Sequence, residues 1–238
     1  MIPQSISRFY KSVDTDRTED GYLVRLDGRP LRTPMETPLL LPNKRLAAVI
    51  AKEWNEQEET VNLLSMAMTG FANTAIDRVA PRRKEVIDGL IAYAETDLVC
   101  YRAKEPAELV NLQARAWQPH LDWLEGTYGA KLLTTTGIIH LKQNPATLDV
   151  IRRVLASRND FTLTGVYIMT AAMGSLVLSL AVADGALDAK RAAAAGQLDV
   201  IFQAKHWGED EEAISRRKRI AREVALVEKF LGLLFSET

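Results

Sequence analysis

The chain has 238 residues, 47% of them hydrophobic and 26% charged, which is the profile of an ordinary soluble globular protein. Its 30 basic and 31 acidic side chains leave a formal net charge of -1, so the overall charge favours neither nucleic acid nor an anionic membrane as a partner. The single cysteine, Cys100, excludes an intramolecular disulfide, and the three histidines lie too far apart in the sequence to predict a metal site.

The first 42 residues are typical of short β-strands. Residues 22–26 and 30–33 flank the dipeptide Asp27-Gly28, which tolerates the positive φ angles that a tight hairpin turn requires. Residues 39–41 predict a third short strand, because three leucines are followed directly by a proline. The N-terminal part is therefore expected to contain a small β-sheet.

A helical pattern begins after residue 43. Asn43 is a favoured N-cap residue, and Leu46, Ile50 and Trp54 follow at intervals of four, which makes one apolar stripe on a helix. A tryptophan on such a stripe belongs in a core, so we expect Trp54 to be a structural residue.

Helical spacing dominates the rest of the chain. Predicted helices cover residues 66–79, 82–103, 107–128, 145–157, 163–183, 188–205 and 211–235. Pro119 is expected to kink or split the third of these helices. Residues 131–141, rich in threonine and isoleucine, predict an extended segment that returns to the β region. We therefore expect an α+β protein with an N-terminal domain of residues 1–70 and a helical domain of residues 71–238. The segment 131–141 is a candidate further part of the N-terminal domain.

The segment 163–183 has two interpretations. Its 21 residues carry no charge, which is long enough to cross a bilayer. Polar or small residues such as Thr170 and Ser175 occur throughout it, and Asp160 and Asp184 flank it without a basic anchor after its end. We expect a buried central helix, with a single-span membrane protein as the alternative.

Motifs for nucleotide binding and serine hydrolysis are absent from the sequence, so no cofactor, catalytic or metal-binding residue is predicted. The segment 93–102 nevertheless contains Glu95, Asp97, Cys100 and Arg102. Glu95, Asp97 and Cys100 would serve a small hydrolase or transferase if a base approached from elsewhere. The structural alternative is a buried pair of Asp97 and Arg102 that holds a helix end.

An acidic segment precedes the last helix. Glu209, Asp210 and Glu212 follow Gly208, a residue that commonly ends helices. Acids in the first turn of a helix interact favourably with its dipole, which is one interpretation. The other is that these carboxylates contact a partner. The basic run 216–219 is expected to be a solvated helix face.

Several motifs in order give the sequence a resemblance to a known family. They are Arg8-Phe9-Tyr10-Lys11, Leu26-Asp27-Gly28-Arg29-Pro30-Leu31, Glu53-Trp54, Ala72-Asn73-Thr74-Ala75-Ile76-Asp77, Thr96-Asp97-Leu98-Val99-Cys100-Tyr101-Arg102-Ala103 and Trp207-Gly208-Glu209-Asp210. Together they resemble the assembly chaperone of the α subunit of F-type ATP synthase, over residues 7 to 230. Each motif is weak alone, whereas the ordered set is specific.

The resemblance implies a protein that is not an enzyme and uses no cofactor. Such a chaperone binds the unassembled α subunit and keeps it from aggregating until the β subunit takes its place. The resemblance also implies an N-terminal β-containing domain and a C-terminal orthogonal helical bundle. We expect a monomer in the bacterial cytoplasm, or in the mitochondrial matrix if a presequence has been removed.

The sequence departs from the family pattern at one acidic site. An acid tends to follow the Leu-Asp pair before the final helices, whereas here Leu198-Asp199 is followed by Val200-Ile201. Glu209, Asp210 and Glu212 are therefore the expected partner contacts.

Overall fold

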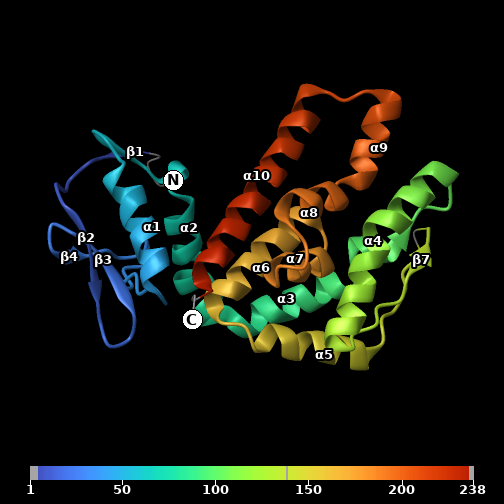
Figure 1. The fold of residues 1–238 in the computed structure, drawn as a ribbon, viewed down its shortest axis with the longest axis horizontal. Coiled ribbons are helices and arrows are strands. Elements are labelled where there is room, and N and C mark those ends of the chain that lie inside the picture. The colour runs from blue at the N-terminus through green and yellow to red at the C-terminus, as the bar shows by residue number, and fades with distance from the viewer. Residues whose placement is uncertain (1–4, 138, 236–238) are drawn as a thin grey trace. The chain divides into compact units, whose positions relative to one another are not determined.

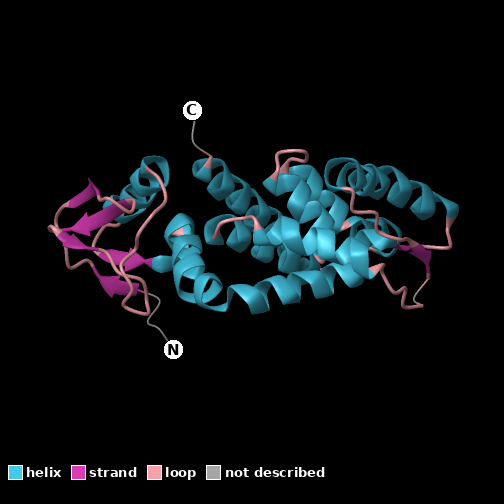
Figure 2. Ribbon diagram, turned by 90° about the horizontal axis from the view of Figure 1, so that it is seen from below, coloured by secondary structure: helices cyan, strands magenta, loops and turns pink. Residues whose placement is uncertain are grey.

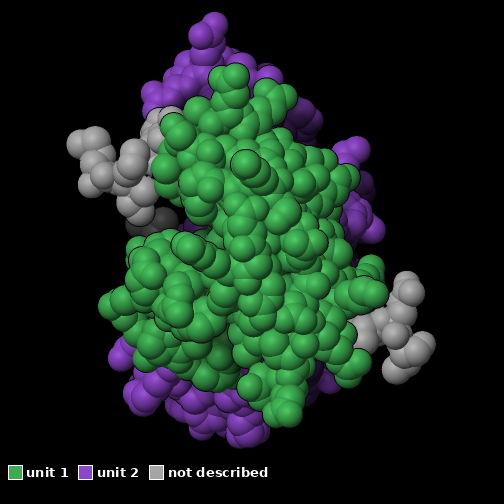
Figure 3. Space-filling model, turned by 90° about the vertical axis from the view of Figure 1, so that its left-hand side faces the viewer, with its two compact units in different colours: residues 1–83, 160–164, 229–238 green, residues 84–159, 165–228 purple. Residues whose placement is uncertain are grey.

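Two parts of the chain form separate sets of packed elements in this computed structural model, which describes residues 5–137 and 139–235. Unit 1 contains residues 1–83, 160–164 and 229–238, and unit 2 contains residues 84–159 and 165–228 (Figure 3). The N-terminal run of unit 1 thus extends beyond the expected boundary at residue 70, and two later segments join it.

Unit 1 is built on small antiparallel sheets and short helices. Its strands are β1 (Ser5–Ser7), β2 (Val13–Arg17), β3 (Tyr22–Leu26), β4 (Arg29–Pro30) and β5 (Thr60–Asn62), and its helices are α1 (Lys44–Asn55) and α2 (Ala67–Thr74). One sheet has the order β2-β3-β4, and β1 pairs with β5 in another. Helix α1 packs against β2 and β3 (Figures 1 and 2).

The local signals of unit 1 are confirmed. Asp27 and Gly28 have φ angles of 48° and 78° and form the tight turn between β3 and β4. The Oδ1 atom of Asn43 accepts a hydrogen bond from the backbone N–H of Leu46 at 2.9 Å, which caps α1. The predicted strand 39–41 is wrong in extent, because Leu41 makes only an isolated bridge to Tyr22.

Helices make up most of unit 2. Its elements are α3 (Arg83–Glu95), β6 (Tyr101–Arg102), α4 (Ala107–Tyr128), β7 (Thr135–Thr136), α5 (Pro145–Ala156), α6 (Asp160–Met173), α7 (Leu176–Ala183), α8 (Ala189–Gly196), α9 (Leu198–Trp207) and α10 (Glu211–Leu234), of which the ends of α3, α6 and α10 belong to unit 1. β7 pairs in parallel with β6, and the described residues of the segment 131–141 belong to unit 2. Among the described residues, this segment pairs with none of the N-terminal strands. The predicted α+β class is confirmed.

The apolar segment 163–183 is two helices rather than one. Gly174 has a φ of 72°, which a glycine adopts without strain, and it separates α6 from α7. The Oγ atom of Ser175 then accepts a hydrogen bond from the N–H of Leu178 at 3.1 Å and caps α7. All eight residues of α7 are buried, as expected for a central helix. Across the described ranges, no helix is both long enough and apolar enough to span a membrane.

Three other helix predictions differ from the structure in part. Pro119 lies within a continuous α4, so of the two expected effects, a kink or a split, the split does not occur. The helix predicted over 82–103 ends at Glu95, and a single 3-10 turn, Leu98–Cys100, follows. The helix predicted over 188–205 is interrupted at Gln197, between α8 and α9.

Candidate functional site

Trp54 lies in the core of unit 1. Its side chain is 7% exposed, and its ring centroid lies 5.6 Å from that of Tyr10. The Tyr10 hydroxyl donates a hydrogen bond of 2.7 Å to the backbone carbonyl of Trp54. These contacts hold the end of α1 against the loop that precedes β2, which is a structural role.

Asp97 is fully buried in unit 2, where its carboxylate binds backbone N–H groups. Its Oδ1 accepts from the N–H of Val99 at 3.2 Å, and its Oδ2 accepts from the N–H of Val177 at 3.0 Å. The carboxylate thereby caps the start of α7 across 80 residues of sequence. Burial raises the pKa of Asp97 to about 6, against the lowering effect of its hydrogen bonds.

Arg102 does not use Asp97 as the partner that the sequence suggested. Its Nε donates to the carbonyl of Val99 at 2.8 Å, and its Nη1 donates to the carbonyl of Gln113 at 3.2 Å. Its guanidinium also lies 5.4 Å from the ring centroid of Trp117. Asp97 and Arg102 therefore stabilise the same region through separate backbone contacts.

The candidate catalytic group does not assemble into a reactive site. Cys100 is buried, and burial raises the pKa of its thiol to about 12, so the thiolate that acts as nucleophile is not formed near neutral pH. Glu95 is exposed at the end of α3, whereas Asp97 is enclosed. Within the ranges that the structure describes, no three His, Cys, Asp or Glu side chains gather as a metal site would require.

Other acids of the ordered motifs also hold the fold of unit 1. The carboxylate of Glu53 accepts from the N–H groups of Met68 and Thr69, both at 2.8 Å, and so caps α2 from another helix. Asp77 accepts from the Oγ1 of Thr33 at 2.7 Å. These side chains satisfy donors that the loops and the start of α2 would otherwise expose.

The three acids near the start of α10 differ in the contacts that they make. Glu209 has a side chain only 12% exposed, and both its oxygens bind the guanidinium of Arg217, one of them at 2.6 Å from Nε. Asp210 accepts from the N–H of Ala213 at 2.7 Å and caps α10. Glu212 is exposed in the first turn of α10. The capping interpretation thus applies to Asp210, whereas the carboxylate of Glu209 is already paired with Arg217 of the same chain.

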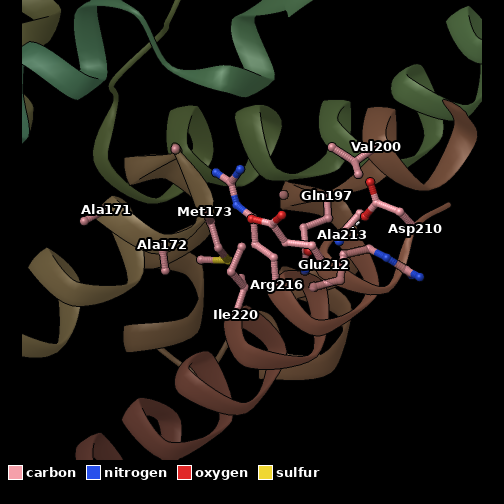
Figure 4. Close-up of a pocket in the computed structure, with 13 residues that line it drawn as sticks. Ala171, Ala172, Met173, Gln197, Val200, Asp210, Glu212, Ala213, Arg216 and Ile220 are labelled. Carbon is pink, nitrogen blue, oxygen red and sulfur yellow. Dashed lines mark hydrogen bonds between the residues drawn. The ribbon is translucent and has the colours of Figure 1, made fainter. Parts of the chain in front are cut away.

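A cavity of about 510 Å³ lies beside this segment in unit 2 (Figure 4). It is lined by residues from the end of α6, from α8 and α9, and from the first half of α10. The apolar part of the lining includes Ala172, Met173, Val200, Ala213 and Ile220, and the charged part is Asp210, Glu212, Arg216 and Arg217. A lining that combines apolar and charged side chains can accept an apolar side chain of a partner and orient it through polar contacts.

Two exposed apolar residues of α9 were not predicted as site residues. Trp207 is 78% exposed and Val200, which lines the cavity, is 47% exposed. The spacing of seven residues, which places two side chains on one face of a helix, was the signal that could have identified them. The sequence placed the tryptophan in a family motif and beside the acidic segment, but it was not selected as a contact residue.

Comparisons with known proteins agree on one family. The model of the ATP12 chaperone protein family matches residues 7–125, which is half of the chain. The crystal structure of Atp12 from Paracoccus denitrificans is 40% identical, has a TM-score of 0.93 and covers 96% of this chain and 98% of its own. A structure from Agrobacterium tumefaciens is 35% identical, with a TM-score of 0.90 and coverage of 97% and 87%.

A curated relative extends the comparison to a eukaryote. The mitochondrial protein atp12 of Schizosaccharomyces pombe is 29% identical over 225 residues, which cover 89% of this chain and 77% of that protein. The match to the family model and the similarity over nearly the whole length of a solved Atp12 confirm the resemblance found in the ordered motifs. The chain therefore belongs to the ATP12 chaperone family, whose members serve the assembly of the F1 sector of ATP synthase.

Proposed function

We propose that this chain binds the unassembled α subunit of ATP synthase, prevents its aggregation and gives it up when the β subunit arrives. Membership of the ATP12 chaperone family is the observation that carries the proposal. A subunit destined for an oligomer exposes apolar interface while it is free, and such a surface is an aggregation hazard. A chaperone that covers this surface and later leaves needs moderate affinity, with specificity from polar contacts.

The action that we propose is binding without catalysis. The buried thiol of Cys100, whose pKa is raised, and the separation of Glu95 from Asp97 both support this proposal. A cavity lined by both apolar and charged side chains also suits a protein contact. The chain is expected to act as a monomer, in the cytoplasm of a bacterium or in the mitochondrial matrix.

Asp210 and Glu212 are the proposed partner contacts among the three acids first selected. Both line the cavity, and Glu212 is exposed. Glu209 is assigned a positioning role instead, because its two oxygens are bound by Arg217. A basic group on the α subunit would complement the two remaining carboxylates.

The test is an aggregation assay of purified free α subunit with the full chain and its variants. The parent protein should suppress light scattering at a stoichiometric ratio, without ATP. Glu212→Gln should weaken protection, whereas Glu58→Gln, which changes an exposed glutamate of unit 1, should not. Melting curves of each variant separate stability from binding. If the parent fails to protect the α subunit but protects another F1 subunit, the choice of client is wrong.

A further inference from the structure

Helix α9 carries an apolar face that no described element of unit 2 covers. Trp207 and Val200 lie seven residues apart, on the same side of the helix, and are 78% and 47% exposed. A tryptophan is usually well buried, since its ring removes a large apolar area from water. An exposed ring at this position therefore calls for a partner that covers it.

The exposed tryptophan is held on a defined framework. Gly208, with a φ of 81°, ends α9, and its N–H donates to the carbonyl of Ala204 at 3.0 Å. The Nδ1 of His206 lies 2.9 Å from the carbonyl oxygen of Phe202, and the centroids of the two rings lie 4.4 Å apart with a tilt of 37°. The turn that follows Gly208 leads into α10 (Figure 1). The ion pair of Glu209 with Arg217 ties this turn to the helix. Because these contacts already hold the turn, less conformational entropy is lost when a partner binds.

The charges around Trp207 include more carboxylates than cations. Asp210, Glu211 and Glu212 follow it within five residues and are exposed, Lys205 precedes it and is also exposed, and Glu209 is neutralised by Arg217. Asp210 uses one oxygen to cap α10, and its other oxygen remains available. Arg216 adds a second cation at the cavity, so the turn and the cavity together carry three carboxylates and two cations besides the pair of Glu209 with Arg217. A partner with lysine or arginine complements the three carboxylates, which disfavour a phosphate backbone or an anionic membrane.

We propose that the tip surface, formed by Val200, Trp207, Asp210, Glu211 and Glu212, docks a segment of the free ATP synthase subunit in which an apolar side chain is flanked by lysine or arginine. The apolar side chain packs on Trp207 and reaches the cavity past Val200, and the basic groups face the three carboxylates. This inference rests on the proposed function, since it takes an ATP synthase subunit as the client. It adds the recognition surface and the chemistry of the segment that binds there.

A matched pair of variants tests the apolar contact. Trp207→Ser should raise the concentration that gives half-maximal protection of the α subunit by about 30-fold, because interface tryptophans are frequent hot spots. The control is Leu64→Ser in unit 1, which removes a side chain that is also 78% exposed. The control should change protection less than twofold. Both variants should melt at the temperature of the parent.

A second variant tests the charge complementarity. Replacing Glu211 and Glu212 together with glutamine keeps the Asp210 cap and removes two charges. Binding of the parent should weaken as sodium chloride is raised from low to physiological concentration, and the double variant should bind more weakly with a shallower salt dependence. An unchanged affinity with an unchanged salt dependence would contradict the charge assignment.

Site-specific crosslinking distinguishes the inference from the proposed function. A photoreactive amino acid is placed at position 207 or, as a control, at position 64 of the full chain, which is then mixed separately with free α and free β subunits. An adduct from position 207 to a basic, apolar segment of the α subunit supports both proposals. An adduct only with the β subunit supports the tip surface and overturns the choice of client. Protection of the α subunit without any adduct at position 207 overturns the tip surface alone, and neither protection nor adduct overturns both.

Discussion

Arginine in place of Trp54 would put a charge into the core of unit 1. The indole is 7% exposed and packs on Tyr10, whose ring already carries the guanidinium of Arg8 at 4.7 Å from its centroid. Loss of a buried tryptophan ring costs about 3–5 kcal/mol, and burial of an unpaired charge adds to it. For a chain of this length each kcal/mol lowers Tm by about 2–4 °C, so Trp54→Arg should lower Tm by at least about 6 °C.

The same change at Trp207 is the control, because that side chain is 78% exposed. Trp207→Arg should leave Tm within about 2 °C of the parent and still impair client protection, whereas Trp54→Arg should lose protection only through unfolding. Melting curves followed by circular dichroism, together with the aggregation assay below the transition, separate the two effects. An unchanged Tm for Trp54→Arg would refute the assignment of this residue to the core.

Phenylalanine in place of tryptophan tests the contribution of a single atom, the indole Nε1. The Nε1 of Trp54 is buried without a hydrogen-bond partner among the described residues, whereas the Nε1 of Trp117 donates to the carbonyl of Ala195 at 2.8 Å. Phenylalanine at position 54 relieves an unpaired donor, and at position 117 it leaves an acceptor unpaired. Trp117→Phe should therefore be the more destabilising change by about 1–3 kcal/mol in urea titrations, and the reverse order would contradict this reasoning.

Three further predictions concern internal contacts. Burial raises the folded-state pKa of Asp97 to about 6, above its unfolded value of about 3.9, so the native state binds this proton more tightly than the unfolded state does. As the pH rises from 5 to 7 the native state loses that proton, and the free energy of unfolding should fall by about 1 kcal/mol. Asp97→Asn should remove this pH dependence. Glu53→Ala should cost about 2 kcal/mol by uncapping α2, with Glu53→Gln costing less; equal losses in urea titrations would show that the second oxygen adds nothing. Gly196→Ala should destabilise by about 1–3 kcal/mol, because its Cβ would lie 2.9 Å from the Cβ of Met173. Gly126→Ala, in the last turn of α4 where a Cβ meets no other atom, should stabilise by up to about 1 kcal/mol; a Tm that moves the other way for either variant would count against the packing.

The parts of the fold that follow from short-range rules were predictable. The turn at Asp27-Gly28 requires only backbone angles that these two residues tolerate, and the cap at Asn43 requires only a side-chain oxygen three residues before its donor. The period of apolar residues likewise predicted α1, α4 and α10, because each helix buries one face. Family membership also followed from the sequence, since it depends on the order of motifs and not on their contacts.

The break at Gly174 was not predictable from the same rules, because an uncharged run with apolar residues throughout has no face that marks where a buried helix ends. The role of Asp97 depends on Val177, and that of Glu53 on Met68 and Thr69, so neither is visible before the chain is folded. The sequence alone could not distinguish the roles of the acids near the last helix. Folding placed Arg217 against Glu209 and left Asp210 and Glu212 at the cavity, because which carboxylate an arginine reaches depends on how α9 and α10 are joined in space.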